Sequence, residues 1–335
     1  MSRASLVVCT LLCLFAFDAA CGQAQPATTN RHTLTVWADG EWATVEGQIR
    51  DIKGSSLLFE PAGELSVKAM PFSSIRSIWF TSDPDFARGV SSFGTKNYRA
   101  AQRHFDKALQ SEGRDWAKLE MMNWMARAMI ADNRRAESIP LFQQIQKMDP
   151  DSRLLADLPL VWDERLPEIE RLKLSPRGLT TADEISRLAI ASCVLHDPEF
   201  QLRATNALKK LRATSKSSVV SQLAAAQLWR LSLWDTTETV QMLTDVWEEQ
   251  WRRMPAMVRA GPGHVLGRCL QQQNEFDGAA LVLLWSPFVR VNDRAIAASS
   301  LKLASQCLAS AGRQADSESV FRELIQGFSG QSAAK

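Results

Sequence analysis

A spacing of small and large residues that recurs along most of the chain is the strongest constraint on its fold. In its first occurrence, Gly89 and Ala101 lie twelve residues apart, and Phe105 and Ala108 follow after four and three more. Such spacing lets two antiparallel helices approach closely at the small residues, while the large side chain fills the space beside them. The region from residue 83 onward is therefore expected to form helical hairpins.

The same spacing recurs further along the chain. Its later occurrences are Ala126, Ser138, Phe142 and Ile145; Ser192, Ala204, Leu208 and Leu211, a weaker match; Gly267, Ala279, Leu283 and Ser286; and Ser305, Ser317, Phe321 and Leu324. The pattern resembles the tetratricopeptide repeat (TPR) family, whose period is about 34 residues. This resemblance implies a mainly α fold, an α-solenoid of TPR-like helical hairpins that curves into a groove.

The repeat region is interrupted in its middle. Residues 83–150 and 181–328 are expected to hold TPR-like repeats, whereas residues 151–180 are expected to form short helices and connecting loop. Three prolines, which break helices, lie in that connection: Pro159, Pro167 and Pro176. Beyond it, residues 218–234 and 236–254 have helical patterns, although their phase in the repeat is not evident.

A short stretch before the repeats alternates polar and apolar residues, which is the period of β-strands. Residues 32–80 are expected to form five short strands, with turns at Asp39-Gly40 and Gly54 and a bend or bulge at Gly47. The stretch resembles Sm-like or SH3-like small barrels. The resemblance implies a small five-stranded β-barrel-like domain, which packs on the repeats or docks a partner.

Sm-like barrels often bind RNA, so the resemblance also raises a nucleic-acid partner. The chain has a formal net charge of +2, which supplies no general attraction to nucleic acid or to an anionic membrane. We therefore expect no nucleic-acid partner.

The N-terminal residues have the layout of a secretory signal. Arg3 precedes an almost wholly apolar run over residues 6–17, and small residues follow. Residues 1–24 are expected to be a signal peptide that directs the chain to the periplasm or cell envelope, with a linker over residues 25–31.

Cys21 stands where a lipoprotein signal carries its acylated cysteine, so a lipid anchor is one outcome of processing. Asp18 departs from that pattern, and simple cleavage near Ala20 or Ala24 is the alternative. No later apolar run is long enough to span a bilayer, and no transmembrane helix is expected. Residues 329–335 are expected to be a flexible tail.

No motif for catalysis, a cofactor or a metal is recognisable. The Gly-rich stretch 261–267 lacks the Lys and Ser/Thr of phosphate-binding loops, and is expected to begin a repeat helix instead. No Cys-x-x-Cys pair occurs, and Cys193, Cys269 and Cys307 are expected to be buried single thiols. A bridge between Cys269 and Cys307 is the alternative. We expect no catalytic residue, no cofactor and no metal.

In TPR arrays the first helix of each hairpin lines the concave groove, and the resemblance carries this role to particular positions. The residues expected to face the groove are Phe86, Val90, Phe93, Asn123, Arg127, His264, Arg268, Gln271, Gln272, Lys302 and Gln306. Their basic and amide groups could clamp a carboxylate or an acidic peptide. A solvated helix face without a partner is the alternative interpretation.

These features together predict an exported TPR-like scaffold that mediates protein–protein interaction in the bacterial cell envelope, with a protein or peptide partner in the groove. An alternative is an enzyme, or an accessory subunit of one, with its site between the β domain and the helical array. A third is a carbohydrate-binding protein, which exposed rings of Trp37, Trp42 and Trp79 in a row would favour.

Overall fold

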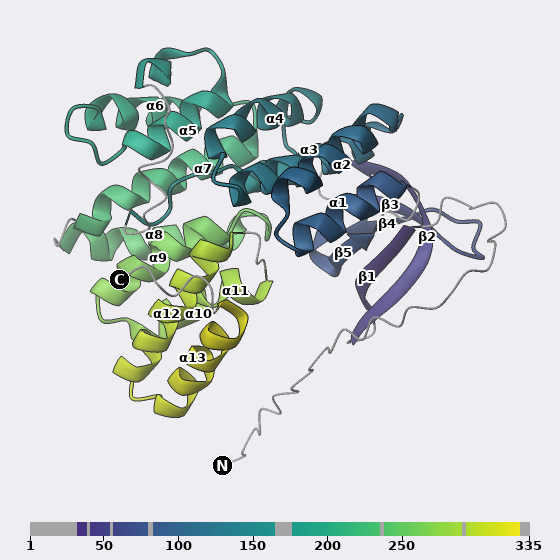
Figure 1. The fold of residues 1–335 in the computed structure, drawn as a ribbon. Coiled ribbons are helices and arrows are strands. Elements are labelled where there is room, and N and C mark those ends of the chain that lie inside the picture. The colour runs from purple at the N-terminus through teal and green to yellow at the C-terminus, as the bar shows by residue number, and fades with distance from the viewer. Residues whose placement is uncertain are drawn as a thin grey trace.

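The chain is mainly α-helical, with a small antiparallel sheet at one end (Figure 1). The computed structural model describes residues 32–38, 41–53, 56–79, 83–164, 176–234, 238–289 and 293–328. The expected signal peptide, Cys21, the linker, the C-terminal tail, and the turns at Asp39-Gly40 and Gly54 lie outside the described residues. The side chains of Trp37, Trp42 and Trp79 also lie outside what is described, so the carbohydrate alternative stays untested.

Five strands form one antiparallel sheet in the order β4-β3-β2-β1-β5. The strands are β1 (His32–Ala38), β2 (Glu41–Lys53), β3 (Ser56–Pro61), β4 (Lys68–Pro71) and β5 (Ile75–Trp79). A 3₁₀ turn at Phe72–Ser74 links β4 to β5, which are the two ends of that order. No pairing among the described residues joins β4 to β5, so a closed barrel remains a prediction.

Gly47 marks a close backbone approach in β2 rather than the bulge itself. A Cβ atom at this position would lie 2.2 Å from the backbone oxygen of Glu60 on β3. The register shift between β2 and β3 comes slightly later, between Ile49 and Asp51. The glycine is therefore needed because only a hydrogen atom fits against the neighbouring strand.

The sheet and the first three helices share one hydrophobic core. Its sheet side consists of Leu34, Val36, Ile49, Leu57, Phe59 and Phe72, and its helix side includes Phe86, Ala101, Phe105, Trp116 and Met121. At its edge, the buried ring of His32 meets Trp116 edge-on at 5.6 Å and lies 3.2 Å from the guanidinium of Arg114. Burial, with the charge of Arg114, lowers the pKa of His32 to about 4, so the ring is neutral at neutral pH.

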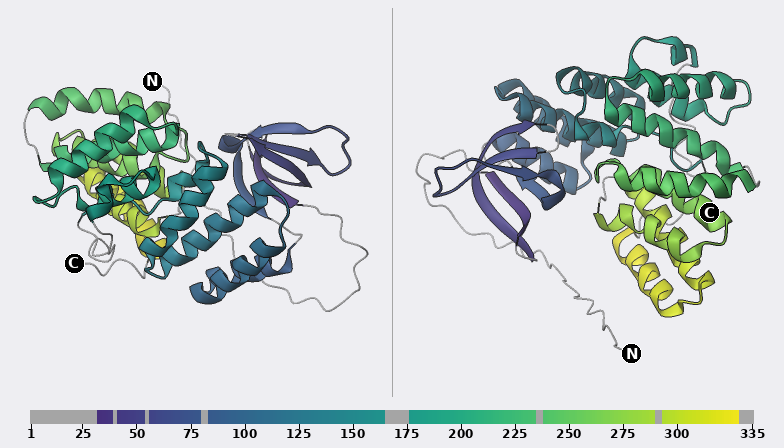
Figure 2. Two further views of the ribbon diagram at one scale, coloured as in Figure 1. Left: turned by 90° about the horizontal axis from the view of Figure 1, so that it is seen from above. Right: turned by 180° about the vertical axis from the view of Figure 1, so that it is seen from behind.

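The helices follow one another along a curved path that leads away from the sheet (Figures 1 and 2). They are α1 (Pro84–Gly94), α2 (Tyr98–Ser111), α3 (Asp115–Ala131), α4 (Arg135–Met148), α5 (Glu184–Val194), α6 (Gln201–Thr214), α7 (Ser218–Trp229), α8 (Glu238–Arg253), α9 (Ala260–Gln272), α10 (Phe276–Leu283), α11 (Trp285–Val289), α12 (Arg294–Ser310) and α13 (Gln314–Phe328). Neighbours in sequence pack on one another, as in α1 with α2, α3 with α4, α9 with α10, and α12 with α13.

The small residues of the repeating pattern lie where paired helices cross. A Cβ atom at Gly89 would lie 2.5 Å from the ring of Phe105, and one at Gly267 would lie 2.5 Å from Leu283. Ser305 and Ser317 replace this close contact with mutual hydrogen bonds of 2.8 and 3.1 Å to each other's carbonyl oxygens. The spacing therefore identified true points of close helix contact.

Four hairpin turns share the same backbone conformation. Lys96, Asn133, Asn274 and Gly312 all have a left-handed φ, between 59° and 78°. Each lies seven residues after the first small residue of its set, namely Gly89, Ala126, Gly267 and Ser305. Non-glycine residues seldom adopt this conformation, so its recurrence at one position shows that these four hairpins are built alike.

The large-residue position of the last set departs from the expected packing. Phe105, Phe142, Leu208 and Leu283 are all fully buried, but Phe321 on α13 is 48% exposed. The expectation that Phe321 fills a gap between helices is therefore wrong. Its equivalents are buried, whereas α13 is the last helix of the described chain.

A second, larger core runs from α3 to α13. Helix α3 contributes to both cores, with Trp116 and Met121 in the first and Met122 and Ala126 in the second. The second core also holds Cys269 and Cys307. All three described cysteines are free thiols, as expected in place of a bridge, although Cys193 is only half-buried rather than buried as predicted. Desolvation raises the pKa of Cys193 and Cys269 to about 12 and that of Cys307 to about 11.

We predict that Gly89→Ala lowers the free energy of unfolding by about 1–3 kcal/mol, because its methyl group would overlap the buried Phe105 ring. Urea denaturation measures this change. The matched control is Gly94→Ala at the end of the same helix, where nothing lies within 4 Å of the added atom. That control should be neutral or stabilising by up to about 1 kcal/mol, and equal losses in both variants would contradict the packing account.

Candidate functional site

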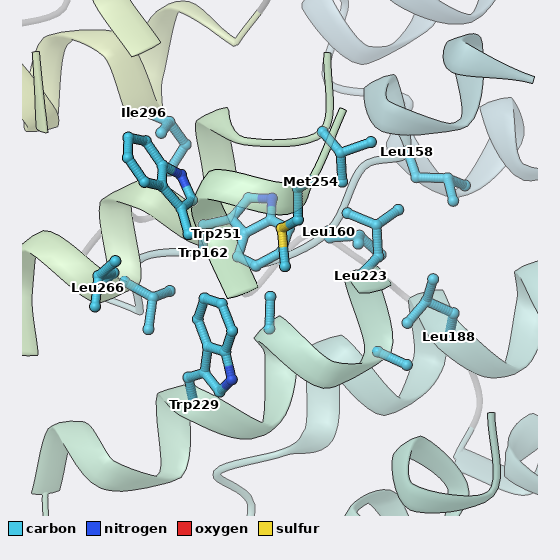
Figure 3. Close-up of a cluster of buried hydrophobic side chains, with 14 of the residues drawn as sticks. Leu158, Leu160, Trp162, Leu188, Leu223, Trp229, Trp251, Met254, Leu266 and Ile296 are labelled. Carbon is cyan, nitrogen blue, oxygen red and sulfur yellow. The ribbon is translucent and has the colours of Figure 1, made fainter. Parts of the chain in front are cut away.

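The connection between the two runs of repeats lies inside the helical array. Its first part forms a 3₁₀ turn at Arg153–Asp157 and then continues without regular secondary structure to Glu164. The buried residues of this segment are Ser152, Leu154, Leu155, Leu158, Pro159, Leu160, Val161, Trp162 and Asp163. Figure 3 shows Leu158, Leu160 and Trp162 among side chains from helices of the second core.

Helices α5, α7 and α9 hold this connecting segment from several sides. The backbone nitrogen of Val161 donates to Ser192 Oγ on α5 at 2.8 Å, and its carbonyl accepts from Gln227 Nε2 on α7 at 3.1 Å. The ring of Trp162 packs on Gly261 of α9 so closely that a Cβ atom there would lie 2.1 Å from it. The glycine at the start of α9 therefore makes room for an indole ring.

Asp163 anchors the end of the segment although it is almost fully buried. Its Oδ2 atom accepts a hydrogen bond from Ser299 Oγ at 2.8 Å and lies 3.2 Å from Nε2 of the buried His264. Its Oδ1 atom lies 3.5 Å from the Arg268 guanidinium. These partners come from α9 and α12, so one carboxylate ties the segment to both helices.

Glu164 forms a second anchor beside the first. It pairs with the fully buried Arg230, with His196 Nε2 at 3.2 Å and with Arg268 at 3.5 Å. Burial alone would raise the pKa of Glu164, but the His196 hydrogen bond and the Arg230 charge outweigh it and hold the pKa at about 2. The carboxylate is therefore ionised at neutral pH, and Arg230 also donates to the carbonyl of Ser192 at 2.8 Å.

The group around His264 contains the residue types of a serine-hydrolase triad. Ser300 Oγ lies 2.8 Å from His264 Nδ1, and Asp163 lies at Nε2. In a serine hydrolase, Nε2 of the histidine faces the serine and Nδ1 faces the aspartate, and the serine faces a substrate site. Here all three side chains are buried, so the arrangement serves to satisfy buried polar groups.

A cavity of about 350 Å³ opens beside the connecting segment. Its lining comes from the turn between α1 and α2, from α3 and the start of α4, from residues 156–162, and from α7, the start of α9 and the start of α12. The buried apolar part of the lining consists of Leu158, Pro159, Trp162, Leu223, Val258 and Ile296. Residues far apart in sequence thus meet at one hollow.

Charged groups surround this apolar floor. Arg127, Arg135 and Arg294 line the cavity together with Asp157 and Asp293. Both carboxylates have structural partners, because Asp157 accepts from Asn123 Nδ2 at 2.9 Å and Asp293 accepts from two backbone nitrogens that begin α12.

Aromatic rings hold Arg127 at the cavity. Its guanidinium stacks 4.3 Å from the Trp124 ring and 5.6 Å from that of Phe93. Stacking of this kind fixes the plane of the guanidinium.

Only part of the expected groove lies at this cavity. Phe93 and Arg127 line it. Phe86, Asn123 and His264 are wrong as contact residues, because each is more than 95% buried. Phe86 packs in the first core, whereas Asn123 and His264 hold carboxylates of the chain's own connection.

Arg268 is mostly buried, and both Arg268 and the exposed Gln272 contact other parts of the chain. Arg268 pairs with Asp163 and Glu164, and Gln272 donates to the carbonyl of Leu233 at 2.9 Å. Reversing the charge of Arg268 would therefore place a carboxylate beside two others and test stability rather than binding. The carboxylates that Arg268 meets thus belong to the chain itself, and a clamp on a partner's carboxylate stays a prediction.

The remaining expected residues lie away from the cavity. Val90 is half-buried against the first core, and Gln271 is half-buried on α9. Lys302 and Gln306 are exposed on α12 and are not part of the cavity lining. The boundary between sheet and helices, where the enzyme alternative placed its site, is packed by buried side chains such as His32 and Trp116.

The residues that sequence reasoning missed are those of the connection. Proline content assigned this part to a loop, yet residues 154–162 read Leu-Leu-Ala-Asp-Leu-Pro-Leu-Val-Trp. An apolar run of this kind outside a helix indicates a buried segment. That signal could have identified the floor of the cavity, although not the helices around it.

No protein-family model, curated protein or solved structure matches the chain. Across the described ranges, no helix is both long enough and apolar enough to cross a membrane. In the same ranges, no group of three or more His, Cys, Asp or Glu side chains is arranged to hold a metal ion.

We predict that Asp163→Ala lowers the free energy of unfolding by about 3 kcal/mol or more, because it removes the buried partner of His264, Arg268 and Ser299. Thermal or urea denaturation measures the loss. Asp277→Ala is the control, since this exposed carboxylate pairs with Arg313 at the surface and should cost less than about 1 kcal/mol. Similar small losses in both would show that the anchor contributes little.

Proposed function

We propose that this chain is an exported scaffold of TPR-like repeats that binds a protein or peptide partner in the bacterial cell envelope. The cavity beside residues 156–162 is the proposed contact site. The observation that carries the proposal is an apolar hollow with a charged rim, assembled from both runs of helical hairpins. The four matching hairpin turns and the close contacts at Gly89 and Gly267 support the TPR-like part.

The rim and floor indicate the kind of group that would bind. A hollow of this volume accommodates one or two large apolar side chains, and Trp162, Leu158 and Ile296 supply its buried surface. Arg127, which stacks on two aromatic rings, contributes positive charge to the lining and so favours an acidic group. The proposed ligand is therefore a segment with an apolar anchor next to an acidic group.

The lining favours binding over catalysis. Its acidic side chains, Asp157 and Asp293, are engaged by Asn123 and by the start of α12. General acid–base chemistry needs a titratable group directed at the substrate. Asp163 and His264, which form the buried titratable cluster, are not among the lining residues.

Site-specific photo-crosslinking in the native host tests this proposal. A photoreactive amino acid at Ala131, which is exposed at the cavity, should capture a defined partner. The same amino acid at Lys209, exposed on α6 and outside the lining, is the matched control and should not capture it.

Arg127→Glu should reduce the yield at Ala131 about tenfold or more, because it reverses the charge at the rim. Lys209→Glu should leave the yield unchanged. Identical proteins captured at both positions, or no protein at Ala131, would exclude the cavity as a partner site.

A further inference from the structure

The last described helix, α13, carries apolar side chains on both its faces. Its inner face, with Val320, Leu324 and Phe328, is buried against the array. On its outer face, Phe321 is 48% exposed and Ile325 is 53% exposed. These two residues are four apart and therefore form one stripe along the helix.

The repeat pattern indicates what this stripe is built to contact. Phe321 occupies the position held in earlier hairpins by Phe105, Phe142 and Leu283, all fully buried. Phe105, for example, packs against Trp124 of the following helix, α3, with ring centroids 5.7 Å apart. Because Phe321 holds the corresponding position in α13, we expect another helix to pack on this stripe.

The two ends of the described array differ in what covers them. The sheet covers the first hairpin and shares its core, with Phe59 and Phe72 in the same cluster as Phe86 and Phe105. Among the described residues no helix follows α13, and its outer face is apolar at Phe321 and Ile325.

We infer that α13 pairs with α13 of a second copy of this chain, antiparallel and about a two-fold axis. In an α-helix each residue turns by about 100°, so Glu318 and Arg322 lie about 40° apart on one side of the stripe. A two-fold axis at the level of residue 320 places Glu318 opposite Arg322 of the partner subunit.

The same axis brings the Phe321 side chains of the two copies together. Phe321 lies next to the level of the axis, so the two copies of this ring meet at the centre of the contact. Both Glu318 and Arg322 are exposed, and Glu318 accepts a hydrogen bond from Gln314 on its own helix. Two equivalent ion pairs thus flank one aromatic contact, which makes the surface self-complementary, as a two-fold interface requires.

A contact made by one helix from each copy is small. Stable dimers bury roughly 1,200–2,000 Å² in total, and a single helix pair lies at or below the lower limit of that range. We therefore expect a reversible dimer with a dissociation constant in the micromolar range. The concave cavity is not part of this contact, so the inference does not depend on the proposed partner.

Sedimentation velocity of the purified protein across the micromolar range tests the inference. The native chain should pass from monomer to dimer, and Phe321→Glu or Ile325→Glu should weaken association at least tenfold. Since both side chains are largely exposed, neither change should disturb folding, which circular dichroism verifies. Leu281→Glu on α10 is the matched control, because Leu281 is 71% exposed and should not affect dimerisation.

Charge reversal separates this pairing from other modes of association. Glu318→Arg and Arg322→Glu should each weaken the dimer, because each places like charges opposite one another. The double variant should restore it, since the ion pairs form again with reversed signs. A chain that stays monomeric, a dimer equally sensitive to Leu281→Glu, or a double variant weaker than either single would overturn the inference.

Discussion

Two neighbouring carboxylates, the buried Asp163 and the partly buried Glu164, organise the interior of this protein. Moving such groups out of water costs several kcal/mol each, so they are tolerated only where charged and hydrogen-bonding partners surround them. Their partners include Arg230, His264 and Arg268, which come from the α7 and α9 region. The connecting segment that ends at these carboxylates is thereby tied to helices that lie far from it in the sequence.

This anchor determines where a ligand could bind. The segment that ends at Asp163 fills the inner side of the helical array and places Trp162 on Gly261. The cavity of about 350 Å³ lies beside this segment, and its lining includes residues of the first hairpin and of α12. Helix α3 connects this region to the sheet, because its opposite faces belong to the two cores. Stability and the candidate site therefore rest on the same residues.

Sequence reasoning succeeded where one local rule decides the packing. Gly89 and Gly267 were placed correctly because a small residue and its large partner lie within one hairpin. The rule failed for His264, because it predicted a residue that faces the groove, whereas this buried histidine meets Asp163, which lies about a hundred residues away in the sequence. Spacing reveals which face a helix presents, but not which distant segment covers it. For the same reason Phe321 could not be told from its buried equivalents, since nothing in its own repeat records that no described helix follows α13.

Hydrogen–deuterium exchange over residues 158–164 tests the central claim, that the chain's own connection fills the concave interior. The account predicts slow exchange, comparable with that of the buried helix α7, because the segment is buried and its Val161 nitrogen donates to Ser192. The exposed loop at residues 64–67 gives the fast reference in the same experiment. Exchange over 158–164 as fast as in that loop would contradict the account, because the groove would then be open to solvent.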